Sequence, residues 1–270
     1  MLSSHFTVHT AAISDIGYVR KRNEDALKYN LEEGYFILAD GMGGQNSGDI
    51  AANECVERLS SALSALRNKQ SKKSYSVHEC EAQLMQLIIQ VNKEIYSHAT
   101  SDPNLYGMGT TLCVAYLFED KVVYGHVGDS RIYRFNPNPQ LGDNFQQLTQ
   151  DHSLASELVA SGEITQDKVK AFPLKHVLTR AIGTNSTVLP TVSYCDIETQ
   201  DFILMCSDGL TNYTTDKEIE EILDSNSHSS LSPDGKIEKS TQELVSLAKQ
   251  NGGGDNITVI LIYFDDISRQ

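Results

Sequence analysis

The sequence lacks any apolar run long enough to span a bilayer. Its first residues have neither the basic region nor the apolar core of a signal peptide. The five cysteines are scattered, odd in number and mostly set within apolar runs, so they predict neither a disulfide framework nor a zinc site. We therefore expect a cytoplasmic protein that contacts no membrane and keeps reduced cysteines in its core.

Positive charge is also scarce. The chain has 22 Lys and Arg against 36 Asp and Glu, a net charge of −14 at pH 7. This balance argues against nucleic acid or an anionic membrane surface as the main partner. The sequence shows no internal repeat and no linker between domains. Its 270 residues therefore predict one domain, residues 1–270, large enough to bury a substantial core.

What the sequence does contain is an apolar run, 35–39, that stops abruptly at Asp40 and is followed by glycines at 41, 43 and 44. An apolar run cut off by glycine is typical of a buried strand that ends in a tight loop. Asp40 would lie at the end of this strand, where glycine lets the backbone approach a bound group closely. The carbonyl of Gly41 is a second oxygen donor at the same place.

The same pattern recurs at Asp208, Asp255 and Asp129, each beside glycine and a β-like run. One such aspartate is usually a turn residue or a cap, but four are hard to explain in that way. Carboxylates brought together repel one another unless cations lie between them. Oxygen-only ligands favour Mg²⁺ or Mn²⁺, so the pattern predicts a carboxylate-lined metal site.

A charged segment precedes the Asp40 strand by a short hairpin. Glu24 and Asp25 are near enough in sequence to reach the same site, and Arg20 is a cation that can bind an oxyanion through two parallel hydrogen bonds. The alternative interpretation of this segment is a solvated charged turn.

Periodicity predicts the remaining elements. Apolar residues at helical spacing indicate long helices over 48–66 and 79–99, and three β-like runs cover 112–118, 122–127 and 131–135. The Pro/Asn/Gly-rich segment 136–144 is predicted as a hairpin tip or small insertion, and the Ser-rich segment 225–239 as a loop. Two long helices between β-rich ends suggest an α+β domain with sheet packed on sheet and helices outside.

Eight motifs together resemble one known family, the metal-dependent Ser/Thr protein phosphatases of type 2C (PPM) in their compact bacterial form. Any one motif is weak evidence, but all eight occur in family order between residues 14 and 260. They are Arg20 with NED at 23–25, DGMGG at 40–44, GMGTT at 107–111, GDSR at 128–131, DHS at 151–153, LTRAIG at 178–183, SDGL at 207–210 and GDNIT at 254–258.

The resemblance implies an α-β-β-α sandwich of two antiparallel sheets flanked by helices, with a dimetal site at the sheet edge. It implies that Asp40 bridges two Mn²⁺ or Mg²⁺ ions. Asp208 and Asp255 would complete the first metal site, and the carbonyl of Gly41 would bind the second ion. Residues of about 153–175 would form the flap found in the family.

The resemblance also assigns the outer parts of the site. Glu24 and Asp25 would bind metal-coordinated waters, and Arg20 would hold the substrate phosphate. Asp129 would bind a third, weaker metal ion that it shares with Asp208.

The implied activity is hydrolysis of phosphoserine and phosphothreonine on proteins by a water or hydroxide that bridges the metals, which would reverse Ser/Thr kinase signalling. The expected partners are phosphorylated proteins, among them a cognate Ser/Thr kinase and its substrates, and we expect a monomer. Two alternatives stay open: a phosphatase dedicated to one regulator, and a pseudophosphatase that binds a partner without turnover.

Two departures from the family concern the acid that protonates the leaving group. Eukaryotic members carry His directly after the Asp-Gly, where this chain has Met42, and many bacterial members carry His after the Gly-Gly, where it has Gln45. Neither side chain donates a proton usefully. The acid therefore stays open. One hypothesis is a metal-bound water on the ion expected at Asp129, and His126 and His152 are nearby candidates, although a structural role is the commoner one for such a histidine.

Overall fold

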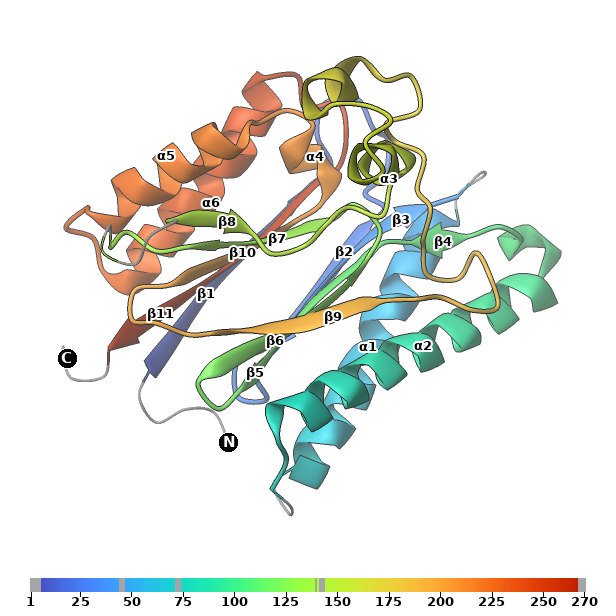
Figure 1. The fold of residues 1–270 in the computed structure, drawn as a ribbon, viewed down its shortest axis with the longest axis horizontal. Helices are drawn as coiled ribbons and strands as arrows, with labels where there is room; N and C mark the ends of the chain where they lie inside the picture. Colours follow the sequence, from blue (N-terminus) through green and yellow to red (C-terminus); the bar gives the residue numbers. More distant parts are fainter. Residues whose placement is uncertain (1–5, 44–46, 71–73, 139, 141–143, 267–270) are drawn as a thin grey trace.

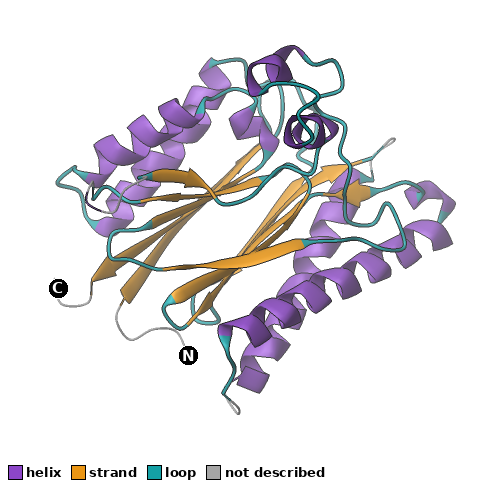
Figure 2. Ribbon diagram, in the orientation of Figure 1, coloured by secondary structure: helices purple, strands orange, loops and turns teal. Residues whose placement is uncertain are grey.

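Two antiparallel sheets lie face to face, and helices cover the outer face of each (Figures 1 and 2). The computed structural model describes residues 6–43, 47–70, 74–138, 140 and 144–266. The arrangement confirms the predicted α-β-β-α sandwich. Within the described residues, no helix is both long and apolar enough to cross a membrane. Part of the predicted 136–144 insertion, and Gly44 and Gln45, lie outside the described residues.

The first sheet joins both ends of the described chain. Its outer face is covered by α4 (Asp208–Thr211), α5 (Asp216–Ser227) and α6 (Pro233–Gln250). Its strands run in the order β1 (Phe6–Asp15), β11 (Ile257–Asp266), β10 (Phe202–Cys206), β7 (Arg131–Phe135) and β8 (Phe145–Gln147).

The second sheet is covered by α1 (Gly48–Gln70) and α2 (Val77–Ser101), the two helices that the apolar spacing predicts. Its strands run in the order β2 (Asp25–Asn30), β3 (Tyr35–Met42), β5 (Leu112–Phe118), β6 (Lys121–Val127) and β9 (Thr191–Asp196), and the short β4 (Gly109–Thr110) pairs with β3. One turn of 3₁₀ helix, η1 (Pro103–Leu105), connects α2 to β4.

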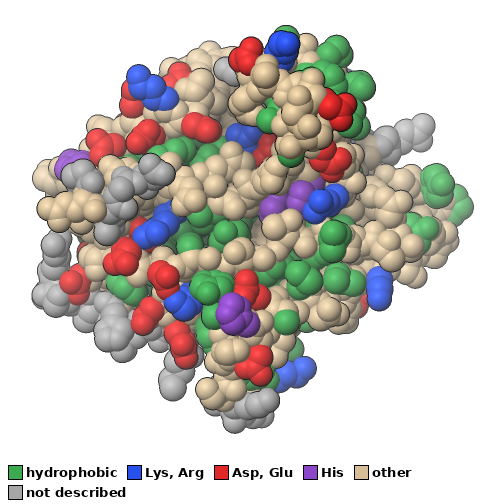
Figure 3. All heavy atoms as spheres, in the orientation of Figure 1, with side chains coloured by type: hydrophobic (Ala, Val, Ile, Leu, Met, Phe, Trp, Pro, Cys, Tyr) green, Lys and Arg blue, Asp and Glu red, His purple; other side chains and the backbone are tan. Residues whose placement is uncertain are grey.

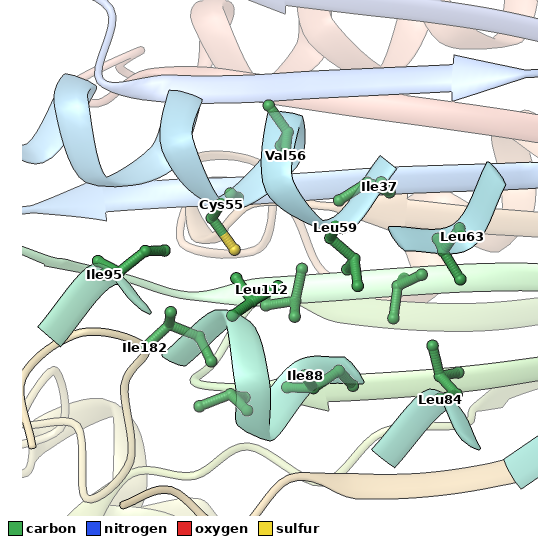
Figure 4. Close-up of a cluster of buried hydrophobic side chains, with 14 of the residues drawn as sticks. Ile37, Cys55, Val56, Leu59, Leu63, Leu84, Ile88, Ile95, Leu112 and Ile182 are labelled. Carbon is green, nitrogen blue, oxygen red and sulfur yellow. The ribbon is translucent and has the colours of Figure 1, made fainter. Parts of the chain in front are cut away.

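Three apolar clusters hold these layers together. One fills the space between the sheets, where Phe36 of β3 and Met205 of β10 are fully buried. A second packs α4, α5 and α6 on the first sheet. In the third, Leu59 of α1 and Ile88 of α2 point toward Leu112 of the second sheet (Figure 4). Rigid layers on both sides fix the strand ends, where the candidate site lies.

One predicted element is wrong. The Ser-rich segment 225–239 is a loop only over 228–232, because α5 continues to Ser227 and α6 begins at Pro233. Ser232 caps α6 by accepting a hydrogen bond from the N–H of Gly235, and Pro233 occupies the first turn, where its missing N–H costs nothing. Ile237 is fully buried and anchors this turn on the sheet. Burial of one apolar face therefore outweighs the weak helix propensity of Gly235 in this first part of α6.

The segment 153–175, predicted as a flap, contains α3 (Leu154–Ala160) and the 3₁₀ helix η3 (Gln166–Ala171). In Figure 1 both lie at the end of the sandwich that holds α4. Ser153 caps α3 through its side-chain oxygen.

Candidate active site

Four strand ends bring the predicted aspartates to one edge of the sandwich. Asp25 opens β2 and is the direct antiparallel partner of Asp40 near the end of β3. Asp208 follows β10, and Asp255 precedes β11, the antiparallel neighbour of β10. Because an antiparallel pair places the end of one strand beside the start of the next, these carboxylates gather although they are far apart in sequence. Like charges on directly opposite residues destabilise a sheet.

The backbone at Asp40 is held by the GMGTT motif. The Thr111 N–H and the Thr110 hydroxyl both donate to the Asp40 carbonyl, at 2.8 and 2.9 Å, and the Thr111 hydroxyl accepts from the Asp40 N–H at 3.0 Å. A Cβ at Gly41 would lie 2.1 Å from the carbonyl oxygen of Gly48, so only glycine allows α1 to start against this strand. Sequence reasoning found these motifs but assigned them no such role.

Asp129 lies where the chain crosses from β6 in the second sheet to β7 in the first. His152 holds the preceding Gly128 by two hydrogen bonds: its N–H donates to the Gly128 carbonyl at 2.9 Å, and its Nδ1 accepts from the Gly128 N–H at 3.2 Å. The DHS motif thus fixes the loop that carries Asp129. Burial, followed by the charges of Asp208 and Asp151, raises the pKa of Asp129 to about 7.

The other carboxyl groups also have raised pKa values. Burial raises the pKa of Asp40 well above its usual range, and the charges of its acidic neighbours, first Asp25 and then Asp208, add to that rise. Burial also raises the pKa of Asp25 to about 6, although the Ser207 hydroxyl donates to this carboxylate at 2.8 Å. Burial and the charge of Asp255 raise the pKa of Asp208. This edge therefore has an excess of negative charge.

Arg20 lies at this edge of the sandwich, beside Asp255 and Glu24. Its Nη2 donates to Asp255 Oδ2 at 2.8 Å, and Nη1 lies 3.9 Å from Glu24 Oε2. The hydrogen bond to Asp255 is the first cause that raises the pKa of the Arg20 guanidinium. Its side chain is 47% exposed, so it can turn toward an oxyanion at the opening.

A cavity of about 580 Å³ opens between these groups. Seven of the eight residues that the sequence predicts for the site line it. The eighth, Asp25, lies behind the wall, where it is buried against Ser207. The lining residues are Arg20, Glu24, Asp40, Gly41, Met42, Gly43, Thr111, Asp129, Lys175, His176, Leu178, Asp208, Asn212, Tyr213 and Asp255.

Sequence reasoning missed Lys175, His176 and Asn212. Asn212 donates to Asp208 Oδ2 at 2.9 Å from four residues further along, a spacing at which helical side chains meet. Lys175 and His176 come from the 153–175 segment and its end, and no periodic pattern marked them. A second cavity of about 430 Å³ lies beneath this segment and also borders Asp129, Asp208 and both of these residues.

His126 and His152 do not line the cavity. Both are buried, and their rings stack with centroids 4.3 Å apart. Nε2 of His126 lies 2.8 Å from the Gln150 carbonyl. Burial, with the charges of His126 and Arg180, lowers the pKa of His152 to about 3. Both histidines therefore have structural positions, and neither is placed to protonate a substrate in the cavity.

The donor set fits a hard divalent cation in its chemistry, since the convergent groups are carboxylate and carbonyl oxygens with uncompensated charge. As the side chains stand, no group of three or more Asp, Glu, His or Cys residues in the described ranges is arranged to hold a metal ion. The present rotamers are those of carboxylates hydrogen-bonded to Arg20, Asn212 and Ser207. Side chains rotate while strand ends stay in place, so the crowded carboxylates with raised pKa values still fit such a cation.

The chain is similar to known proteins over nearly its whole length. The model of the protein phosphatase 2C family matches residues 18–249. The chain is 38% identical over 258 residues to the serine/threonine phosphatase stp of Listeria innocua, covering 94% of this chain and 95% of that protein. It is similar to the structure of the serine/threonine phosphatase Stp1 from Staphylococcus aureus, with a TM-score of 0.82, 31% identity and 97% of each chain covered. The catalytic domain of the phosphatase PstP, solved with two manganese ions, has a TM-score of 0.77 and 29% identity over 97% of this chain and 100% of that one.

Proposed function

The chain belongs to the protein phosphatase 2C family and is a metal-dependent serine/threonine protein phosphatase; from that premise we propose how its own residues perform the reaction. The observation that carries the assignment is the convergence of Asp40, Asp208, Asp255 and Asp129 on one cavity with Arg20 at its mouth. The relatives are named as phosphatases, so neither a pseudophosphatase nor a phosphatase dedicated to one regulator is favoured.

Asp40, Asp208 and Asp255 would hold the divalent cations, with the carbonyl of Gly41 as a further ligand. When bound, the cations supply Lewis acidity, which lowers the pKa of water and neutralises charge on phosphoryl oxygens. Glu24, which lines the cavity, would accept hydrogen bonds from waters at the site and hold them in place. Asp25 would do so once its carboxylate turns from Ser207 toward the cavity. The Thr110 and Thr111 contacts keep the Asp40 backbone fixed throughout.

Arg20 would leave Asp255 and bind the non-bridging oxygens of the phosphate, because its guanidinium is half-exposed at the opening. Such a cation stabilises the charge that develops in phosphoryl transfer. The same side chain would then neutralise carboxylates before substrate arrives and phosphate afterwards.

The departing Ser or Thr oxygen needs a proton, and we assign its delivery to His176. Of the histidines in the described part of the chain, His176 is the one that lines the cavity. Histidine in general carries and releases protons near neutral pH. Replacing His176 with Ala should slow hydrolysis of a phosphothreonine peptide by about 10²-fold and that of p-nitrophenyl phosphate, whose phenolate leaves unaided, far less. Equal losses on both substrates would contradict the assignment, as would a selective peptide defect in His126→Ala.

The more detailed predictions from the sequence stay proposals. We propose Mn²⁺ or Mg²⁺ as the ions, two at Asp40 and a weaker third at Asp129. A cognate Ser/Thr kinase with its substrates, a monomeric state and a cytoplasmic location remain predictions.

The proposed function is tested with a phosphothreonine peptide and the full chain. Phosphate release should fall to background after treatment with EDTA and return with Mn²⁺ or Mg²⁺, and titration of each ion identifies the better activator. Full activity in the chelator would refute the role of the carboxylates as metal ligands.

A further inference from the structure

The segment that carries Arg20 presents four more side chains to solvent. Tyr18 and Val19, which precede Arg20 in the sequence, are 68% and 69% exposed, and Lys21 and Arg22, which follow it, are also exposed. We propose that these four residues, the flanking strip, bind the stretch of a phosphoprotein next to its phosphorylated residue and favour acidic and apolar neighbours there. The inference rests on the proposed function, because it places the phosphate at Arg20.

The backbone of this segment is fixed. The Tyr18 N–H donates to the Gly253 carbonyl at 2.7 Å. The side-chain amide of Asn256 donates to the carbonyls of Ile16 and Arg22, at 3.0 and 2.9 Å, and so holds the segment at both ends. Gly17 has φ +74°, and a Cβ there would lie 2.2 Å from the Asp255 carbonyl oxygen. A segment fixed in this way presents its side chains in one arrangement, which lowers the entropy lost on binding.

These exposed side chains contribute little to the stability of the fold. Tyr18 packs its ring under the Lys249 ammonium, 4.9 Å from the ring centroid, which orients the ring but leaves most of it in water. Lys21 and Arg22 make no ion pair and no side-chain hydrogen bond with any described residue. Adjacent exposed apolar and unpaired cationic groups on a rigid backbone are typical of a binding surface rather than of a fold requirement.

The charge of the strip contrasts with that of the molecule. The chain carries a net charge of −14, and on the face shown in Figure 3 the acidic side chains are spread among fewer basic ones. Lys21 and Arg22 of the strip directly follow Arg20, so three cations are consecutive, and consecutive Cα atoms are about 3.8 Å apart. With the phosphate at Arg20, a carboxylate one to three residues away in an extended peptide, at about 3.3 Å per residue, reaches Lys21 or Arg22. The occupant that this charge selects is a phosphoprotein segment with Asp or Glu beside the phosphoresidue.

The test compares two phosphothreonine peptides of equal length, one flanked by Glu and one by Lys, with the Mn²⁺-loaded full chain. We expect kcat/KM to be about tenfold higher for the acidic peptide than for the basic one, and this ratio should fall at high salt. In K21E/R22E this preference should disappear or reverse, whereas turnover of p-nitrophenyl phosphate, which has no flanking residues, should change less than about twofold.

The matched control carries the same charge change on the helix layer. Lys69 is in the last turn of α1, whose 23 residues span about 34 Å from Gly48, and Lys93 is exposed on α2. K69E/K93E should keep the full preference for the acidic peptide. Loss of preference in this control would assign the effect to net charge and overturn the strip as its source.

The apolar half of the strip has its own measurement. Val19→Ser should raise KM about threefold for a peptide with Leu beside the phosphothreonine and leave KM for the Ser counterpart unchanged. Phosphate release with no difference between the acidic and basic peptides, or a preference unchanged in K21E/R22E, would overturn the inference and leave the proposed function intact. Failure of the wild-type chain to release phosphate from either peptide with Mn²⁺ would instead refute the proposed function.

Discussion

Strand β10 has a buried or half-buried aspartate just outside each end, and the two are held in opposite ways. Asp201, before the strand, is only 1% exposed. It accepts hydrogen bonds from Arg134 Nε at 3.0 Å, from Asn136 Nδ2 at 2.7 Å and from the Glu198 N–H at 2.8 Å. Burial raises the pKa of Asp201, but these hydrogen bonds and the charge of Arg134 oppose the rise. At the other end, the charge of Asp255 adds to the effect of burial on the pKa of Asp208.

This contrast separates a structural carboxylate from a functional one. At the Asp201 end the chain itself supplies the cation and the donors that a buried charge requires. At the Asp208 end it supplies one amide donor, Asn212, and one half-exposed cation, Arg20 on Asp255, against several carboxylates, so most of the negative charge is left for a ligand to balance. A buried aspartate thus indicates a functional site when its neighbours are also negatively charged, and gives no such indication when its neighbours neutralise its charge.

The largest expected effect is on turnover, and it should differ between the two ends. Asp208→Asn should reduce phosphate release to near background, a loss of at least about 10³-fold, because it removes a charge that is proposed to hold the catalytic cations. Asp201→Asn should keep its turnover per folded molecule but lose about 1–3 kcal/mol of unfolding free energy, because Arg134 loses its ionic partner. Phosphate release and urea denaturation measure the two quantities, and an inactive yet stable Asp201→Asn would break the comparison.

The next effect is on stability in the presence of metal. Mn²⁺ at 100 times its Kd should add about 2.7 kcal/mol to the stability of the folded state. The melting temperature should rise by several degrees in the wild type and in Asp201→Asn, but not in Asp40→Asn. Scanning calorimetry with and without Mn²⁺ gives the shifts. An equal rise in Asp40→Asn would place the metal site elsewhere.

Asp129 should give a smaller effect than Asp208. Asp129→Asn should slow turnover by about tenfold, since the proposed third, weaker ion would be lost while the two proposed at Asp40 would remain. Isothermal titration with Mn²⁺ should show one fewer bound ion than the wild type. Unchanged stoichiometry would argue that Asp129 binds no metal.

The smallest effect is the pH dependence of the metal-free protein. The pKa of Asp25 is raised to about 6 and that of Asp129 to about 7, so the folded state binds protons more tightly than the unfolded chain. The stabilisation from these protons is fully present below about pH 4 and is lost as the pH rises through 6 and 7.

In EDTA the melting temperature should therefore fall by a few degrees between pH 5 and pH 8. Asp129→Asn should flatten this slope, whereas Glu238→Gln, which changes an exposed acid on α6, should not. A melting temperature that rises with pH in EDTA would contradict the uncompensated charge at this edge.

Local patterns in the sequence were enough to identify most of the site. Asp40, Asp208 and Asp255 each adjoin an apolar run and a glycine, and such a strand end is encoded by neighbouring residues alone. The two long helices were predictable for the same reason, because their apolar periodicity is local. The first part of α6 was not, since its helix depends on burying Ile237 against a sheet formed by distant strands.

Only the tertiary structure decided which residues surround the carboxylates. Sequence proximity to a motif suggested His126 and His152 as acids, but packing stacks them behind the Asp129 loop. The segment around His176 reaches the cavity through a long-range arrangement that no periodicity records. By itself, the sequence determined that carboxylates stand at strand ends. Strand register and packing between the sheets decide that these carboxylates come together, that Asp25 lies behind Asp40, and which cations face them. Distant parts of the chain set both of these jointly.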